Sequence, residues 1–184
     1  MVDENSNIKT FPGTGSSPPS RTMPNNLQAE QNLLGAILLD NSVLERIDDR
    51  LLADHFYDPS HGRIFSTMQR LAERGQLANP VTLKSFFTDS EDFQSDGAEP
   101  YLSALADGVI SITQAPDYAK IIHEAHVRRQ LILIGDEVIL DASHPEVDVP
   151  AHQQIETAES KLFRLADTDS TSVGLRGFDT VISG

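Results

Sequence analysis

The sequence predicts an all-α fold, with a small helical bundle body followed by a projecting two-helix hairpin. Between Asn26 and Ala166 the apolar residues recur every three or four positions, which is the period of a helix face. No segment alternates apolar and polar residues with β-branched enrichment, so we expect no sheet. These patterns divide the chain into four parts: a disordered tail (1–25), a helical body (26–110), a long helix and helical hairpin (111–167), and a linker with the start of a linker helix (168–184).

The expected tail is rich in Pro, Gly, Ser, Thr and Asn and has few apolar side chains to offset the entropy of ordering. The body then begins with a helix over Leu27–Leu39, which Asn25 or Asn26 can cap. A capping box formed by Ser42 and Glu45 predicts a second helix. Its apolar face would consist of Leu44, Ile47 and Leu51.

A third helix is predicted after Asp58, because Asp caps helices and Pro59 tolerates the first helical position. Gly75 is its expected stop. The apolar stripe of this helix comprises Ile64, Phe65, Met68, Leu71 and Ala72. Two short helices follow, over Leu83–Phe87 with Thr82 as cap and over Pro100–Ala106.

Two long helices complete the prediction, from about Pro116 to Ala142 and from about Val149 to Ala166, with Pro145 enforcing the break. The first would be ~40 Å long, which exceeds what a body of this size can flank. Two long helices joined by a short turn form a hairpin, so this hairpin should project from the body.

The apolar residues of the first long helix point in several directions. One face would pack on the body (Tyr118, Ile121, Ile122, Ala125), and another would meet the returning arm (Leu131, Ile134, Val138, Ala142). The returning arm offers Ile155, Ala158, Leu162, Leu165 and Ala166. Because one neighbouring helix covers a stripe of only ~100°, the hairpin leaves four aliphatic side chains without a partner: Ile132, Ile139, Leu133 and Leu140.

Exposed aliphatic surface of this extent usually marks a protein–protein contact. The alternative is that a helix of the body folds over these side chains. We favour a projecting, self-associating hairpin, and the candidate interaction residues are Ile132, Leu133, Val138, Ile139 and Leu140.

Composition restricts the classes of function. There are 28 acidic and 14 basic residues, and the net charge of −14 disfavours strong direct DNA binding, which relies on Lys and Arg. The same charge motivates an alternative function, an acidic all-α adaptor that binds a basic protein partner. The longest purely apolar runs have four residues, so no membrane span is expected. Without cysteines or a secretion signal, the expected location is the cytoplasm.

The sequence offers little for catalysis. None of the four lysines follows a glycine, so the Walker A motif that holds nucleotide phosphates is missing. His123 and His126 are three residues apart, whereas the zinc-protease motif needs four. A small metal enzyme using His55, Asp58 and His61 is a remote alternative, because Asp58 is better explained as a cap and His61 as a half-buried residue. We therefore expect no catalytic, cofactor-binding or metal-binding residues in this chain.

Several motifs, taken in order, resemble the N-terminal domain of the DnaB-type replicative DNA helicase of bacteria. The first runs from Pro24 through the stretch LQAEQ into LLGAILLD, which ends at Asp40. The remaining motifs are Phe56–His61 with Ile64–Phe65, Leu71–Gly75, Val81–Leu83, Tyr118–Ala119 with Ile121–Ile122, Arg128–Ile132, and Ala158–Glu159 with Leu162–Phe163. The sequence departs from the family pattern at Asn79–Pro80 and at the single Gly97, which affects loops only.

This resemblance implies a helical body with a hairpin that pairs between subunits, so that six copies form a ring-shaped collar of three dimers. It also implies docking of the primase C-terminal domain and an action of helicase loader proteins on the ring. ATP and Mg²⁺ would belong to a motor domain that this chain lacks, and 178–184 would start the linker helix toward it. The expected function is a non-catalytic module for subunit assembly and primase docking.

Overall fold

The structure, a computed structural model, describes residues 22–47, 51–87, 97–144 and 149–170, with only the backbone for 168–170. Within these residues the chain is helical and has no strand, which confirms the predicted all-α class. The expected tail up to 21 and the expected linker helix at 178–184 lie outside the described residues. The elements are α1 (Leu27–Leu39), α2 (Val43–Arg46), η1 (Ala53–His55, a 3₁₀ helix), α3 (Pro59–Glu73), α4 (Pro80–Lys84), α5 (Ala98–Asp107), η2 (Ile112–Gln114, a 3₁₀ helix), α6 (Ala115–Ser143) and α7 (Ala151–Ser170).

The strongest start and stop signals act as the sequence predicts. The side chain of Asn26 accepts a hydrogen bond from the amide of Ala29 at 2.9 Å and caps α1. Asp58 accepts from the amide of Ser60 at 2.8 Å and caps α3, with proline in the first turn. Beyond the end of α3, Gly75 adopts a φ of 66°, a left-handed conformation that favours glycine.

Two short helices differ from prediction. Ser42 forms no capping hydrogen bond; its hydroxyl donates instead to Asp40 at 2.7 Å, so the predicted capping box is wrong and α2 has only four residues. The rest of that predicted helix, 48–50, lies outside the described residues. The next short helix, α4, begins earlier than predicted, because Asn79 is its cap and accepts from the amides of Val81 and Thr82.

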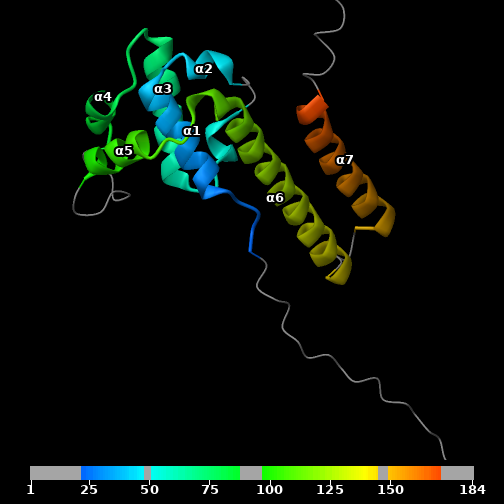
Figure 1. Ribbon diagram of the computed structural model, residues 1–184. Helices are drawn as coiled ribbons and strands as arrows, with labels where there is room; N and C mark the ends of the chain where they lie inside the picture. The colour runs from blue at the N-terminus through cyan, green and yellow to red at the C-terminus, as the bar shows by residue number, and fades with distance from the viewer. Residues whose placement is uncertain (1–21, 48–50, 88–96, 145–148, 171–184) are drawn as a thin grey trace, which may run out of the picture.

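Helix α1 lies at the centre of the body, and α3, α5 and α6 pack around it (Figure 1). Leu33, Leu34 and Ile37 of α1 are fully buried. Gly35 allows α5 to approach closely, since a Cβ atom there would lie 2.1 Å from the carbonyl oxygen of Leu105. The body is therefore built around one helix that is buried on most of its circumference.

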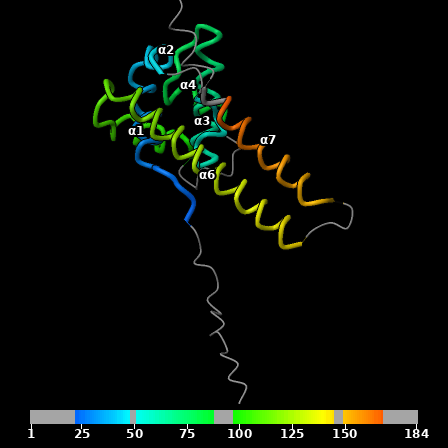
Figure 2. Tube along the Cα trace, turned by 90° about the vertical axis from the view of Figure 1, so that its right-hand side faces the viewer, coloured from blue at the N-terminus to red at the C-terminus, as the bar shows by residue number. Residues whose placement is uncertain are grey.

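Helix α6 belongs to both the body and the hairpin. Its first half packs on the body through Ala115, Ala119 and Ile122, which are buried. Ile121, expected on this face, is 40% exposed, so the packed face is rotated from the predicted one. The second half extends past the body, and α7 returns antiparallel beside it (Figures 1 and 2). Helix α7 continues to Ser170, into the expected linker.

Candidate interaction surface

The two arms of the hairpin are held together by sparse contacts. Gln154 donates a hydrogen bond to the carbonyl oxygen of Asp141 at 3.0 Å, and Lys161 forms an ion pair with Glu137. Ile155 and Leu162 of α7 face α6 and are still 59% and 46% exposed. Apolar surface therefore remains accessible even where the two arms meet.

Two grooves run between the arms. The distal groove, of about 300 Å³, is mainly apolar and is lined in part by Val138, Ala142, Ile155, Ala158 and Leu162. The proximal groove, nearer the body, is lined by Gln130, Leu133, Ile134, Glu137, Lys161, Arg164 and Leu165. The predicted apolar face of α7 thus meets α6, except for Ala166, which is exposed.

The five sequence-predicted interaction residues occupy different positions on α6. Ile139 and Leu140 are 59% and 60% exposed and line neither groove. Val138, 43% exposed, lines the distal groove. Ile132 is half-buried. The structure therefore presents four of these side chains as partly exposed aliphatic surface on the second half of α6, and Ile132 less so.

Two assignments of direction on α6 differ from prediction. Leu133, expected to lack a partner within the hairpin, lines the proximal groove together with Leu165, although it is 45% exposed. Leu131, expected to face the returning arm, lines neither groove and is 47% exposed. The cause is a rotation of the α7-facing stripe toward Gln130, Ile134 and Glu137, away from Leu131.

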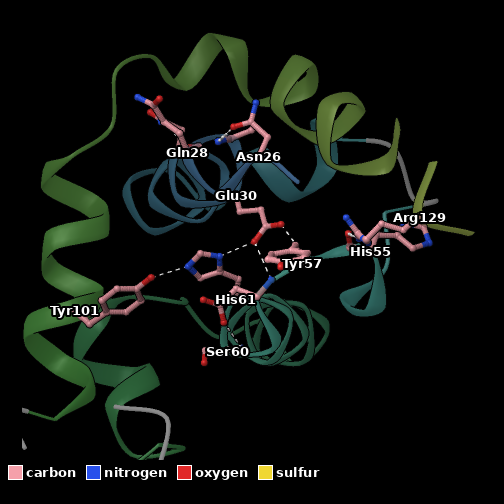
Figure 3. Close-up of polar contacts among 12 residues, drawn as sticks. Asn26, Gln28, Glu30, His55, Tyr57, Ser60, His61, Tyr101 and Arg129 are labelled. Carbon is pink, nitrogen blue, oxygen red and sulfur yellow. Dashed lines mark hydrogen bonds and ion pairs between the residues drawn. The ribbon is translucent and has the colours of Figure 1, made fainter. Parts of the chain in front are cut away.

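A buried polar network in the body was missed by sequence reasoning (Figure 3). Glu30 of α1 is 1% exposed, and its carboxylate accepts from His61 Nδ1 at 2.7 Å and from the amide of Tyr57 at 2.7 Å. The other ring nitrogen, Nε2, lies 2.6 Å from the hydroxyl of Tyr101. Burial raises the pKa of Tyr101, so the hydroxyl keeps its proton and can donate to Nε2. This network ties α1, α3 and α5 together.

His61 is therefore fully buried, which corrects the expectation of a half-buried residue. A signal for the network was present in the sequence. Glu30 precedes Leu33, Leu34 and Ile37 by three, four and seven positions, so a carboxylate lies on the apolar face of α1. A buried carboxylate needs hydrogen-bonding partners, and the sequence alone did not show which residues would supply them.

A cluster of three histidines lies where α6 leaves the body. The ring of His55, from η1, is 4.2 Å from that of His126 and 5.1 Å from that of His123, measured between centroids. The amide of Leu52 donates to His55 Nδ1 at 3.3 Å, which requires an unprotonated nitrogen there. Burial, followed by the charge of neighbouring His126, lowers the pKa of His55 from 6.5 to about 4. Burial likewise lowers the pKa of His126.

Arg129 stabilises the region where α6 leaves the body. Its guanidinium donates to the carbonyl oxygens of Pro24 at 2.8 Å and His55 at 2.7 Å, and it lies 5.7 Å from the centre of the Tyr57 ring. The preceding residue, Arg128, is exposed and pairs with Glu124 at 3.6 Å. Of these two consecutive arginines, Arg129 makes a structural contact and Arg128 lies at the surface. Pro24, assigned to the tail by the sequence, is held against α6.

The structure separates the three residues of the metal-enzyme alternative. Asp58 caps α3, His61 contacts Glu30, and His55 contacts the histidines of α6. Within the described part of the chain, no group of three or more His, Cys, Asp or Glu side chains is placed to hold a metal ion. None of the helices described there has the length and hydropathy required to cross a bilayer.

The fold and the site define a class: an all-α domain with a helical body and a protruding hairpin that carries exposed aliphatic side chains. Comparison with known proteins identifies the family. Residues 22–124 match the family model described as the DnaB-like helicase N-terminal domain, and the chain belongs to this family.

Relatives agree with this assignment. The chain is 42% identical over 150 residues to the replicative DNA helicase DnaB of Rickettsia felis, covering 81% of this chain and 30% of that protein. It is 35% identical over 131 residues to the DnaB of Geobacillus stearothermophilus, covering 70% of this chain and 29% of that protein. The chain therefore spans about 30% of the length of these curated relatives.

Solved structures show the same fold. The N-terminal domain of DnaB helicase from Mycobacterium tuberculosis superposes with a TM-score of 0.64 at 26% identity, over 78% of this chain and 99% of that one. A structure of a DnaB-like replicative helicase and its interactions with primase matches with a TM-score of 0.60 at 26% identity, over 76% of this chain and 31% of that one.

Proposed function

We propose that this chain is the N-terminal assembly and docking module of a replicative DNA helicase. Its hairpin pairs with that of a neighbouring subunit in a hexameric ring, and the collar so formed docks the C-terminal domain of primase during DNA replication. Helicase loader proteins are further candidate partners. The site of action is the cytoplasm, and ATP and Mg²⁺ act in a motor domain outside this chain.

The observation that carries this proposal is the exposed aliphatic surface of α6, on a domain of the DnaB family. Ile139 and Leu140 are about 60% exposed on a helix that extends past the body. None of the helices of the body that the structure describes covers them, which argues against the alternative of an intramolecular partner. The matching structure described as a DnaB-like replicative helicase and its interactions with primase supports primase as a partner.

Self-association is tested by introducing a charge into this surface. Burying an isoleucine side chain contributes about 1.5–3 kcal/mol, and an aspartate in its place must also be desolvated. We therefore expect Ile139→Asp to abolish a weak dimer of the 184-residue chain in analytical ultracentrifugation. Ser160→Asp, at an exposed position of α7 that lines neither groove, is the control and should leave association intact.

Primase docking is tested by light scattering of the chain with and without a primase C-terminal domain. A mass increase that matches a defined complex supports the proposal. A chain that remains monomeric up to about 1 mM and gives no complex with the primase domain would contradict it.

A further inference from the structure

A groove of about 500 Å³ lies on the body, between η1, α3 and the two phenylalanines that follow α4. The described residues that line it all belong to the body, so the groove is separate from the hairpin. Gly62 brings its two walls together, because a Cβ atom there would lie 2.4 Å from the carbonyl oxygen of Ala53. The shape of the groove is therefore set by the close packing of η1 on α3.

One wall of the groove carries a row of polar side chains on α3. Arg63, Thr67 and Arg70 are separated by four and three residues, so they lie along one face of the helix. Thr67 is only 3% exposed. Its hydroxyl donates to the carbonyl oxygen of Arg63 at 2.8 Å and accepts from the guanidinium of Arg70 at 3.1 Å. This buried hydroxyl holds the Arg70 guanidinium at the groove.

Arg70 is a cation without an anionic partner among the described residues. Its hydroxyl partner is neutral, and none of the described carboxylates lies within ion-pair distance of its guanidinium. Other basic side chains of the surface pair with carboxylates, among them Lys84 with Glu99 and Lys161 with Glu137. A guanidinium has five N–H donors and can bind a carboxylate through two of them, so Arg70 retains donors for a ligand.

The groove is basic, although the chain carries a net charge of −14. The described residues that line it include two arginines and a single acidic residue, Asp54. The Asp54 side chain is 75% exposed, and its carboxylate lies 3.8 Å from His55 Nε2, so it faces the histidine cluster. An anionic ligand is therefore attracted to this groove and repelled by most of the remaining surface.

Aromatic surface adjoins the arginines. Phe86 lines the groove and is 48% exposed, and Phe87 beside it is buried. Arginine and aromatic side chains are enriched at protein–protein interfaces and contribute much of their binding energy. Nucleic acid is the less suitable ligand, because its binding depends on many basic contacts along the phosphate backbone. The groove therefore fits a peptide segment that carries carboxylates and an apolar side chain.

We propose that this groove binds an acidic peptide segment of a partner protein, with a carboxylate on Arg70 and an apolar side chain on Phe86. Clusters of arginines recognise acidic motifs in several classes of peptide-binding domain. The planar guanidinium fixes the orientation of the carboxylate through two parallel hydrogen bonds. This inference goes beyond the proposed function, because the site lies on the body and does not depend on pairing of the hairpins.

Arg70 and Arg74 form a matched pair for mutation. Both are exposed arginines near the end of α3, about one turn apart, and of the two it is Arg70 that lines the groove. Charge reversal at either position changes the net charge of the chain equally, so a difference between the two variants reports the groove itself. Arg70→Gln and Phe86→Ala are milder variants that each remove one contact without introducing a charge.

The test measures the fluorescence anisotropy of a labelled probe peptide, in which aspartates flank one phenylalanine, mixed with the 184-residue chain. In about 0.15 M NaCl we expect a dissociation constant below about 1 mM, which Arg70→Glu raises about tenfold or more and Arg74→Glu less than about threefold. Phe86→Ala and Arg70→Gln should each raise it about threefold or more. A probe with asparagine in place of aspartate should bind about tenfold more weakly.

Nuclear magnetic resonance of the isotope-labelled chain locates the binding. The backbone amide signals of Asp54, Gly62 and Phe86 should shift when the probe is added, whereas those of Ile139 and Leu140 in the hairpin should not. Thermal unfolding of each variant confirms that the fold is retained.

Three results would each overturn the inference: no binding of the probe up to about 1 mM, equal weakening by Arg70→Glu and Arg74→Glu, or shifts confined to the hairpin. Tighter binding of a single-stranded DNA oligonucleotide than of the probe would assign the groove to nucleic acid and would also overturn it. All of these results leave the proposed function untouched, because self-association and primase docking are measured separately.

Discussion

At the scale of single residues, the polar groups of this domain depend on contacts between distant positions. Glu30 and His61 are 31 positions apart, and Tyr101 lies 40 positions beyond His61. The position of Glu30 on an apolar helix face indicated a buried carboxylate, but its partners could not be assigned without the packing of α1, α3 and α5. Leaving a buried hydrogen-bonding group without its partner costs about 1–3 kcal/mol, and more for a charged group, so the network stabilises one arrangement of the helices.

The histidine cluster makes the stability of the domain depend on pH. The pKa of His55 is about 4 in the folded chain and about 6.5 when unfolded, so between these values the unfolded chain binds more protons. The contribution of a neutral His55 is present above pH 6.5 and is lost as the pH falls toward 4. We expect the free energy of unfolding to drop by about 2 kcal/mol between pH 7 and pH 5, measured by urea denaturation.

The charged groups around His55 act on its pKa in both directions, and burial remains the largest cause of the shift. After burial, His126 contributes most to lowering the pKa of His55, whereas the exposed carboxylate of Asp54, 3.8 Å from His55 Nε2, raises it. In His55→Gln, the dependence between pH 7 and pH 5 should become weaker, and the part that remains is assigned to His126, whose pKa burial also lowers. His152→Gln, on the exposed side of α7, controls for the loss of a histidine. An unchanged pH dependence in His55→Gln would place its origin elsewhere.

At the scale of elements, local signals fixed most helix boundaries. The predicted range of α1 is the observed one, and Asp58 and Gly75 mark the two ends of α3. Prediction failed at the starts of two short helices, α2 and α4, because Ser42 found a competing partner in Asp40 and because Asn79 was a stronger cap than Thr82. A turn or two of helix depends on such single hydrogen bonds, whereas long helices depend on a repeated apolar face.

Helix packing gives two glycines of this chain opposite roles. Gly35→Ala should destabilise the domain by about 2 kcal/mol, because the new Cβ atom collides with the backbone carbonyl of Leu105 and forces α1 and α5 apart. Gly135→Ala involves the same chemical change in open space, so the monomer should become more stable by up to about 1 kcal/mol. Thermal unfolding at low protein concentration measures both. Equal effects of the two substitutions would contradict the close packing at Gly35.

At the scale of the whole molecule, periodicity predicted the all-α class and the hairpin, and motif order predicted the family. The directions of side chains on α6 were predicted less well. Leu131 and Leu133 were placed on the wrong sides, because a helix with apolar residues all round gives no single stripe from which to infer the partner. The assignment of the residues on α6 that contact another molecule remains a prediction, because apolar residues occur on all sides of this helix.

Salt dependence distinguishes the two functions considered for the whole domain. Contacts between apolar faces do not weaken when salt screens charges, whereas an acidic adaptor loses affinity for a basic partner. We expect the dissociation constant of the self-associated chain to change less than about twofold from 0.1 to 0.5 M NaCl, by analytical ultracentrifugation. A steep loss of association in this range would favour the adaptor.

Helix α6 is continuous over 29 residues, so a tilt of its first half is transmitted to its second half. Arg129 is the point of attachment, because it donates to the carbonyl oxygens of Pro24 and His55. About 14 residues, or about 21 Å of helix, separate it from the end of α6 at Ser143. A tilt of about 5° at Arg129 swings the tip by about 2 Å, which is enough to disengage packed side chains. Arg129 thus divides α6 into two arms of equal length, one packed on the body and one that, under the proposed function, contacts the neighbouring subunit.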